Sequence, residues 1–436
     1  MAIKKPTGTK DLLFGDAQCW RAFQNMAFER FAKFGYTECY LPTFEQTELF
    51  VRGVGESTDV VNKEMFHVLS SQNLRAALEA GSLDAIKAKN RLSLRPEGTA
   101  GVVRSVIENN LVPQGAAPVK LAYAGSMFRA ERPQAGRFRE FYQLGVECIG
   151  SDSAFVEAES IIMLAQFLVD FGIDPDITSI LINSIGCEKC RDSYRKELVA
   201  FLKAHETNLC EDCNRRAETN PLRAFDCKNP GCVAVMKDAP TIDKFICDDC
   251  RAKFEQLKSL LDLGGVPYVE APRLVRGLDY YTGNVFEVQV DSEKTGLGTQ
   301  NAIGGGGAYA HLVKDLGGSD LPGFGFALGY ERCVLARGEG KAPVQTGSSE
   351  KYYVACADDE LRERAFELAL KLRAEGNIVE IDSQGRSLKS QFKQADKLDA
   401  DFVAILGPDE FSNGQYRLRN MKSHDEELCP LPSFRA

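Results

Sequence analysis

The stretch from Phe128 to Gly150 constrains the fold most, because it predicts one strand of a hairpin with two chemically different faces. A first strand is expected at 119–129, and Pro133 and Gly136 mark the polar loop between the two strands. Alternate side chains of a strand share a face. One face therefore carries Phe141, Gln143, Gly145 and Glu147, and the other carries the more apolar set Tyr142, Leu144, Val146 and Cys148.

The polar face of this hairpin is a candidate floor for an anionic ligand with a polar head group. Gly145 leaves a gap between Gln143 and Glu147, as strands do where a ligand lies close to the backbone. Arg129 stands at the loop end, and the fixed fork of a guanidinium suits a phosphate. A surface hairpin with solvated arginines is the alternative, and spacing alone does not separate the two.

The same residues carry a family resemblance. Phe128-Arg129-Ala130-Glu131, followed by the segment from Gly136 to Phe141, resembles motif 2 of the class II aminoacyl-tRNA synthetases. The segment from Gln143 to Glu147 narrows the resemblance to the histidyl-tRNA synthetase family.

Length and composition indicate a multidomain globular chain. With 436 residues we expect two or three domains, and no apolar run among its 44% hydrophobic residues is long enough to span a bilayer. The first residues lack the apolar stretch of a signal peptide, so a cytoplasmic location and no membrane partner are expected. A net charge of −9 disfavours a general nucleic-acid coat, so an RNA partner would be held at defined places.

The N-terminal part predicts a helix and a dimer interface. Trp20, Phe23, Ala27 and Phe31 stand at helical spacing within 16–34. The order of residues from Leu41 to Phe66 resembles motif 1, which builds the homodimer interface in this family, although an ordinary helix–strand connection would read the same way. The alanine-rich stretch 69–91 is expected to be helical and has no assigned function.

A second helix start carries Glu97-Gly98-Thr99, and its Val102, Val103, Val106, Ile107 and Leu111 are expected to face a core. Free N–H groups at a helix start favour anions, while Glu97 adds a negative charge, so the pair suits a zwitterion. The resemblance implies that Glu97, Gly98 and Thr99 hold the amino group of histidine. A plain helix cap is the alternative.

Eight of the fourteen cysteines lie between 187 and 250, and this clustering in a long chain favours metal over disulfides. Four thiol pairs suffice for two structural zinc sites, because each pair spans two corners of a tetrahedron. The candidate ligands are Cys187, Cys190, Cys210, Cys213, Cys227, Cys232, Cys247 and Cys250. Which pairs share a metal is not readable. By resemblance this insertion touches the acceptor arm of tRNA.

The segment from Leu274 to Gly283 closely matches the histidine-specific motif of the family, and a strand is expected at 284–290. Arg276, Tyr280 and Tyr281 make poor core material and could orient a polar ligand. The run Gly304–Gly307 is neither a P-loop nor a dinucleotide fingerprint, and it predicts close approach of backbone to a ligand. Where the family usually continues with Arg-Tyr-Asp, this chain has Ala308-Tyr309-Ala310.

The remaining segments complete the expected domain organisation. Gly325 to Arg332 resembles motif 3, a strand passing into a helix that carries an arginine. Beyond a Gly-, Ser- and Pro-containing linker, strands and helices alternate, which predicts an α/β domain with both sheet faces covered. It resembles the anticodon-binding domain of the family.

We therefore expect an α+β protein, with a class II antiparallel sheet flanked by helices, a Cys-rich insertion domain and a C-terminal α/β anticodon-binding domain. The expected ranges are 1–181 and 261–337 for the catalytic domain, 182–260 for the insertion, 338–350 for the linker and 351–436 for the last domain.

The resemblance implies a ligase that activates L-histidine with ATP and Mg²⁺ and transfers it to tRNA(His). Arg129 and Arg276 would flank the α-phosphate, Phe141 and Arg332 would sandwich adenine, and Glu131 would contact its amine. The resemblance also implies ten histidine-binding residues, among them the two arginines: Glu97, Gly98, Thr99, Arg129, Gln143, Glu147, Arg276, Tyr280, Tyr281 and Tyr309.

Two alternatives belong to other functional classes. One is a regulatory subunit that keeps the synthetase fold and binds histidine as a signal. The other is a catalytically silent module that senses uncharged tRNA. The intact string around Arg276, the insertion and the C-terminal domain speak against the first, and histidine-dependent ATP–pyrophosphate exchange separates both from an enzyme.

Overall fold

The computed structural model describes residues 3–13, 15–56, 58–298, 300–338 and 350–432. The expected linker at 338–350 lies almost wholly outside these residues. Within the described parts of the chain, no helix is both long enough and apolar enough to cross a membrane.

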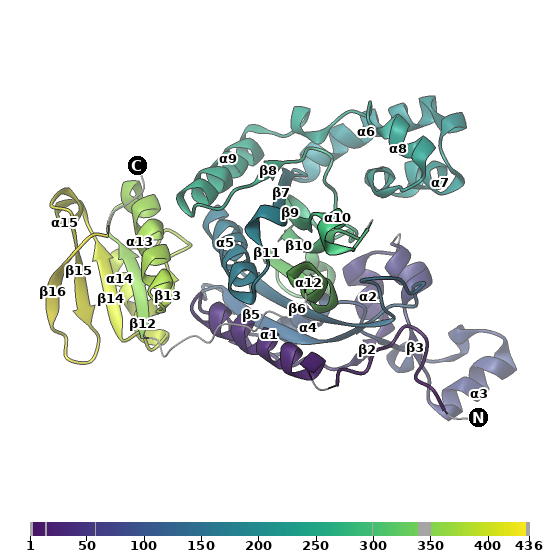
Figure 1. The fold of residues 1–436 in the computed structure, drawn as a ribbon, viewed down its shortest axis with the longest axis horizontal. Coiled ribbons are helices and arrows are strands. Elements are labelled where there is room, and N and C mark those ends of the chain that lie inside the picture. Colours follow the sequence, from purple (N-terminus) through teal and green to yellow (C-terminus); the bar gives the residue numbers. More distant parts are fainter. Residues whose placement is uncertain (1–2, 14, 57, 299, 339–349, 433–436) are drawn as a thin grey trace.

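An eight-stranded sheet forms the centre of the molecule, in the order β1-β5-β6-β11-β10-β9-β7-β8 (Figure 1). The five inner junctions, from β5–β6 to β9–β7, are antiparallel, whereas the short edge strands β1 and β8 pair in parallel. The expected antiparallel core is thus confirmed. The strands are β1 (Thr37–Glu38), β5 (Val119–Phe128), β6 (Glu140–Ile149), β7 (Thr178–Ser184), β8 (Val269–Glu270), β9 (Thr282–Val290), β10 (Ala302–Tyr309) and β11 (Gly323–Gly329).

The predicted hairpin is confirmed as β5 and β6, joined in register from Val119–Ile149 to Phe128–Glu140. Leu144, Val146 and Cys148 are fully buried in the main core, which confirms the apolar face. The gap at Gly145 has a different occupant from the one expected. A Cβ there would lie 2.4 Å from the hydroxyl oxygen of Tyr123, so a neighbouring side chain fills the space.

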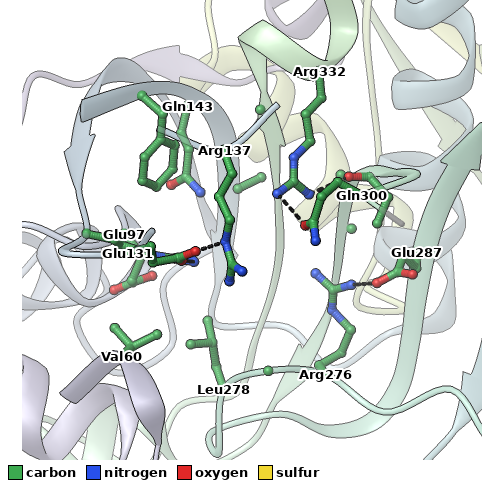
Figure 2. Close-up of a pocket in the computed structure, with 18 of the residues that line it drawn as sticks. Val60, Glu97, Glu131, Arg137, Gln143, Arg276, Leu278, Glu287, Gln300 and Arg332 are labelled. Atoms are coloured by element: carbon green, nitrogen blue, oxygen red, sulfur yellow. Dashed lines mark hydrogen bonds and ion pairs between the residues drawn. The ribbon is translucent and has the colours of Figure 1, made fainter. Parts of the chain in front are cut away.

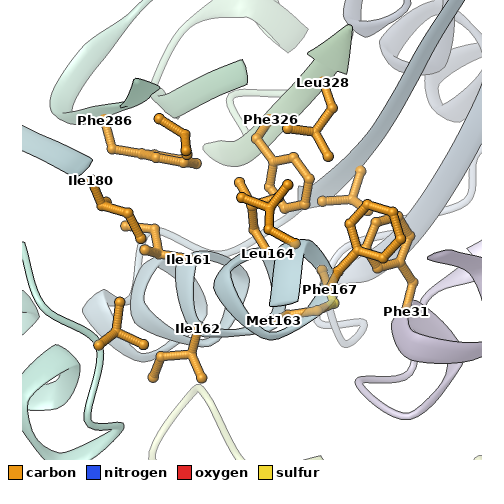
Figure 3. Packing of buried hydrophobic residues seen from close by; sticks show 14 of the residues in the cluster. Phe31, Ile161, Ile162, Met163, Leu164, Phe167, Ile180, Phe286, Phe326 and Leu328 are labelled. Carbon is orange, nitrogen blue, oxygen red and sulfur yellow. The ribbon is translucent and has the colours of Figure 1, made fainter. Parts of the chain in front are cut away.

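Three helices cover the apolar face of the sheet: α1 (Gly15–Ala32), α5 (Ala154–Phe171) and α9 (Asp248–Leu263). Ser153 caps the N-terminus of α5, and Gly172, whose φ of 93° suits glycine, follows its last residue. Figure 3 shows Phe31 of α1 and Phe167 of α5 packed beneath Phe326 of β11. This layer covers one face of the sheet, and the site lies on the other face.

Helix α4 (Thr99–Glu108) lies toward the polar side of the sheet and buries Val102, Val103 and Val106 as expected. Leu111 falls beyond the end of the helix and is 41% exposed, so its expected core position is wrong. The smaller elements nearby are α2 (Thr47–Val54), α10 (Ser292–Thr295), α11 (Leu312–Asp315), α12 (Tyr330–Arg337) and a three-stranded sheet of β2 (Phe44–Gln46), β4 (Leu92–Leu94) and β3 (His67–Val68).

The stretch 69–91 forms α3 (Ser71–Ala80) and two 3₁₀ turns, Leu83–Ala85 and Ala88–Asn90, so its expected helical character is confirmed. Helix α3 stands away from the sheet at one end of the molecule (Figure 1).

The Cys-rich insertion follows β7 and runs along one edge of the catalytic part (Figure 1). It contains α6 (Glu188–Ala204), α7 (Glu211–Thr219), α8 (Pro230–Met236) and short 3₁₀ turns, among them Pro221–Asp226. The boundary expected at 182 falls inside strand β7. At the other end, Phe254, Leu257 and Leu260 of α9 join the main core.

The C-terminal part forms a five-stranded sheet in the order β13-β12-β14-β15-β16. Helix α13 and helix α14 pack on opposite faces of this sheet, as predicted. Its elements are β12 (Lys351–Cys356), α13 (Arg362–Ala374), β13 (Ile378–Ile381), α14 (Leu388–Lys397), β14 (Phe402–Leu406), α15 (Pro408–Ser412), β15 (Gln415–Asn420) and β16 (Glu426–Pro430).

Buried charges join this C-terminal domain to the catalytic domain. Arg373 of α13 is fully buried and forms an ion pair with Glu159 of α5. Lys120 of β5 bridges Glu159 at 3.1 Å and Glu380 of β13 at 2.9 Å. Burial alone would raise the pKa of Glu159, but Arg373 and Lys120 outweigh it and hold that pKa below its usual value.

Candidate active site

A cleft of about 450 Å³ opens above the polar face of the sheet. Residues from the hairpin, from β10 and β11, from the loop that precedes β9 and from the insertion line it. Ten of the predicted site residues lie on its wall: Glu97, Thr99, Arg129, Glu131, Phe141, Gln143, Arg276, Tyr280, Tyr281 and Arg332. The structure thus gathers side chains from 97 to 332 around one cavity.

Arg129 is fixed at the end of β5 by its backbone surroundings. Its Nε donates to the carbonyl oxygen of Pro96 at 3.0 Å, and its guanidinium carbon lies 5.3 Å from the centre of the Phe141 ring. The distance fits a cation–π contact. Arg129 therefore lies beside a flat apolar ring and still faces the cleft.

Arg276 lies flat against the glycine run of β10. Its Nη1 is 2.5 Å from Glu287 Oε2, and a Cβ on Gly305 would come within 2.8 Å of the same nitrogen. We predicted that the backbone of Gly304–Gly307 lies close to a ligand. At Gly305 the space above the backbone is taken by the Arg276 side chain, and Gly304 and Gly305 also line the cleft. Figure 2 shows Arg276 and Arg332 entering the cleft from opposite sides.

Arg332 at the start of α12 is held by three acceptors. It donates to the carbonyl oxygens of Gly136 at 2.8 Å and Ala302 at 2.7 Å, and to Gln300 Oε1 at 3.2 Å. Burial, together with the neighbouring cations Arg129 and Arg137, lowers the pKa of Arg332 to about 10. The guanidinium remains charged at neutral pH.

Apart from Glu131 Oε2, which forms an ion pair with Arg137, two polar atoms of the cleft have no hydrogen-bond partner among the described residues. They are Gln143 Oε1 and Arg276 Nε, and both are buried. A buried polar group without a partner is costly, and in native proteins it calls for an explanation. A bound polar ligand would satisfy both atoms.

Glu97 serves as a helix cap and also lines the cleft. Its two carboxylate oxygens accept hydrogen bonds from the backbone N–H groups of Thr99 and Ala100, each at 2.8 Å. Burial raises the pKa of Glu97, while these N–H donors act in the opposite direction. The capping alternative is therefore realised, and the residue still faces the cavity.

Three predicted histidine-binding residues, although within the described chain, are not among those that line the cleft: Gly98, Glu147 and Tyr309. Glu147 is 1% exposed and accepts hydrogen bonds from Thr99 Oγ1 at 2.6 Å and Tyr309 Oη at 2.7 Å. Burial raises its pKa to about 8. Gly98 packs on Tyr123, where a Cβ would lie 2.2 Å from the ring.

Several cleft residues were not predicted as site residues from the sequence. Arg137 forms an ion pair with Glu131, and its place in the hairpin loop was the available signal. Glu287 and Gln300 enter as partners of Arg276 and Arg332. Arg223, Asp226 and Lys228 reach the cleft from the insertion. These last three residues lie in two short strings, 220–223 and 226–228, that resemble the insertion domain of the family named above, and this resemblance was the available signal.

The eight cysteines of the insertion form two groups of four. One group is Cys187, Cys190, Cys247 and Cys250, and the other is Cys210, Cys213, Cys227 and Cys232. Within each group all sulfur atoms lie within 4.8 Å of one another. The structure thus supplies the pairing of pairs that the sequence leaves open.

Comparison with known proteins follows the same division of the chain. A family model described as histidyl-tRNA synthetase matches residues 8–333, and one described as an anticodon-binding domain matches residues 343–435. The chain belongs to the histidyl-tRNA synthetase family. The resemblance, the fold class and the enzyme class predicted from the sequence are thereby confirmed.

Relatives of this synthetase family cover the whole chain. A "Histidine--tRNA ligase" of Desulfitobacterium hafniense is 42% identical over 434 residues, 100% of this chain and 97% of the relative. A protein of that name from Halothermothrix orenii is 41% identical over 426 residues, 98% of this chain and 96% of the relative. Among solved structures, apo histidyl-tRNA synthetase of S. aureus has a TM-score of 0.60 at 32% identity, covering 98% of this chain and 97% of that one.

Proposed function

We propose that this cleft carries out both steps of histidine–tRNA ligation. In the first step L-histidine and ATP give histidyl-adenylate and pyrophosphate. In the second step the histidyl group passes to the 3′ end of tRNA(His), and AMP leaves. Family membership over the full chain supports this ligase activity, and the residue roles below are our assignments.

Activation requires alignment and positive charge more than proton transfer. The carboxylate of histidine is already ionised at neutral pH, so it attacks the α-phosphorus directly while the bond to pyrophosphate breaks. Negative charge spreads over the phosphoryl oxygens, and fixed cations stabilise it. Arg129 and Arg276 are assigned this role, because both are held in place at the cleft wall.

The adenine of ATP is assigned to the space between Phe141 and Arg332. A flat ring and a guanidinium anchored by three acceptors can hold a base between them. Glu131 is assigned to the exocyclic amine. Arg137 forms an ion pair with Glu131, so nucleotide binding would exchange that partner.

Histidine is assigned to the deeper part of the cleft, beside Glu97, Thr99, Gln143, Tyr280 and Tyr281. The ammonium group of histidine would form an ion pair with Glu97, and a polar group of the ligand would donate a hydrogen bond to Gln143 Oε1. Glu147, with Gly98 and Tyr309 around it, is assigned as the acceptor behind this wall that selects imidazole. Two of its roughly four acceptor positions are used by Thr99 and Tyr309. A site built around a polar partner rejects analogues lacking it by roughly 10⁴ or more.

Magnesium fits the cleft chemically, since Asp59, Glu64 and Asp226 bring carboxylates to a wall that would face the phosphates. When bound, Mg²⁺ supplies positive charge to the phosphate oxygens. We propose it as a cofactor on this basis.

Zinc fits the two cysteine groups. In each group the four sulfur atoms lie within 4.8 Å of one another, as in the tetrahedral structural sites of Zn²⁺, which leave no coordination position for water. Hydrogen bonds, first of all from the backbone N–H of Cys190, lower the pKa of the Cys187 thiol to about 7. Burial raises the pKa values of Cys190 and Cys250, so metal binding would release their protons. We propose two structural zinc ions per chain.

The partners follow from the same assignment. We propose that the domain at 351–436 binds the anticodon of tRNA(His), and that two copies of the chain pair along the motif 1 segment. Two exposed aromatic side chains support pairing: Tyr40, just before this segment, is 83% exposed in the single chain, and Phe44 within it is 50% exposed. A cytoplasmic location fits these substrates.

The observation that carries the proposal is the convergence of Arg129, Arg276 and Arg332 on one cleft that also holds the unpartnered Gln143 Oε1. The test is ATP–pyrophosphate exchange with each of several amino acids, followed by charging of tRNA(His). Exchange that depends on histidine is expected. Histidine binding without any exchange would instead identify a regulatory subunit.

A further inference from the structure

The described residues of the insertion that line the cleft come from one short stretch, Asn220–Lys228, which we name the inner segment. It consists of the 3₁₀ turn Pro221–Asp226 and its flanking residues. Pro221 and Ala224 are buried, and Cys227 belongs to the second cysteine group. The segment is therefore anchored on its insertion side immediately before Lys228.

On its other side the inner segment contacts the loop that carries Arg276. Asn220 Nδ2 donates to Asp279 Oδ1 at 2.7 Å, and Arg223 Nη1 donates to the backbone carbonyl oxygen of Arg276 at 3.2 Å. Asp226 pairs with the same Arg223 nitrogen at 2.9 Å. The backbone of Arg276 is thus fixed by a residue of the insertion more than fifty positions away.

Apolar contacts join the same two stretches. Leu222 and Phe225 of the inner segment belong to the hydrophobic cluster of the insertion. That cluster also includes four residues of the loop, namely Leu274, Leu278, Tyr280 and Tyr281. A further contact comes from α6, where Arg191 Nη1 donates to the carbonyl oxygen of Tyr281 at 3.0 Å. The loop is therefore packed on the insertion at the residues assigned to histidine.

The inner segment also places charge in the cleft. Arg223, Asp226 and Lys228 line the same cavity as Arg137 and Arg332. Arg129 and Arg276 are assigned to the α-phosphate, so the two outer phosphates need other cations. The flexible stem and point charge of a lysine suit a phosphate group.

We propose that the inner segment completes the site of amino-acid activation. Arg223 is a positioning residue that holds the Arg276 loop, and Lys228 contributes a cation to the pyrophosphate part of ATP. This inference rests on the proposed function. It gives the insertion a part in a step that takes place without tRNA.

The first test uses Lys228, whose exposed side chain can be removed without disturbing a core. In histidine-dependent exchange without tRNA, Lys228→Ala should raise the KM for ATP by about tenfold, the scale of one charge-assisted contact. The KM for histidine should stay unchanged, and Lys228→Arg should restore most of the ATP affinity. Lys237→Ala is the matched control, since Lys237 is exposed on the same insertion and does not line the cleft.

The second test separates positioning from folding. Arg223→Ala should lower kcat by about tenfold or more with little change in the KM for ATP, because the Arg276 loop loses a hydrogen bond. Arg223→Lys, which keeps the charge, should recover part of kcat. Bound metal and the circular dichroism spectrum of Arg223→Lys should match those of the parent chain.

The outcomes are distinguishable. A parent chain with no histidine-dependent exchange refutes the proposed function itself. A parent chain that exchanges normally, with Lys228→Ala and Arg223→Ala both within twofold of it in kcat and in the KM for ATP, overturns the inference. In that second case the insertion would serve tRNA alone.

Discussion

Replacement of Arg276 by alanine tests the charge arrangement of the cleft most directly. The side chain is 18% exposed, its Nη1 is engaged by Glu287 at 2.5 Å, and its Nε has no partner in the described structure. A ligand is therefore expected to take the remaining donors. Losing one such donor to a developing oxyanion costs roughly 10² to 10³ in rate, which corresponds to about 2.7–4 kcal/mol.

The same substitution should affect folding much less. Glu287 keeps the hydrogen bond from Gln289 Nε2 at 2.8 Å and is itself 18% exposed, so it is left neither fully buried nor without a donor. We expect a change of about 1 kcal/mol in the free energy of unfolding. Activity and stability should therefore separate clearly.

The assay is histidine-dependent ATP–pyrophosphate exchange, measured beside urea unfolding. Arg276→Ala should lower exchange at least about a hundredfold. The exchange rate of Arg276→Lys should lie between those of the parent chain and Arg276→Ala, because lysine keeps the positive charge and lacks the paired donors of the guanidinium. Arg273→Ala is the matched control, since Arg273 is exposed three residues earlier in the same stretch. A folded Arg276→Ala variant that retains exchange within twofold of the parent would refute this reasoning.

Three further predictions concern the domain interface, the cysteine groups and pH. Arg373→Met should lower the free energy of unfolding by about 3 kcal/mol, because buried Glu159 loses Arg373 and keeps only Lys120; urea curves like those of a Lys371→Met control, whose lysine is partly exposed on the same helix, would contradict this. Cys190→Ser and Cys213→Ser should each reduce bound zinc by about one ion per chain, measured by metal analysis, whereas loss of both ions in one variant would contradict two separate sites. Burial raises the pKa of Glu147 to about 8 from 4.5. Its neutral form stabilises the fold fully below pH 4.5, and this contribution is lost as pH rises through about 8. Between pH 6 and 8 the free energy of unfolding of the parent chain, measured in urea, should therefore fall by about 1–3 kcal/mol relative to that of Glu147→Gln. Parallel pH profiles of the two proteins would contradict the raised pKa of Glu147.

Much of the site could be predicted from short-range pattern. The alternation of β6 puts Leu144 and Val146 in the core and Phe141 and Gln143 at the cleft, because successive residues of any strand point to opposite faces. The spacing of the cysteines indicated two groups of four, since paired thiols a few residues apart can share a tetrahedron. The residues within the family motifs were likewise visible as strings.

Other features depend on contacts between distant parts of the chain. The gap beside Gly145 is filled by Tyr123 from the paired strand, and Glu147 is enclosed by Thr99 and Tyr309 from two other elements. Arg223 meets the Arg276 loop across more than fifty residues. The periodicity of neighbouring residues in the sequence does not predict contacts between such distant segments.

The amino-acid sequence by itself determined which residues share a strand face, where helices begin, and which chemical groups the chain can offer. The covalent geometry of the backbone fixes these properties over a few residues. Only the tertiary structure decided which cysteine pairs close on one another, which side chains shield Glu147, and which residues of the insertion enter the cleft. Those choices depend on sheet order and on the packing of segments far apart in the chain.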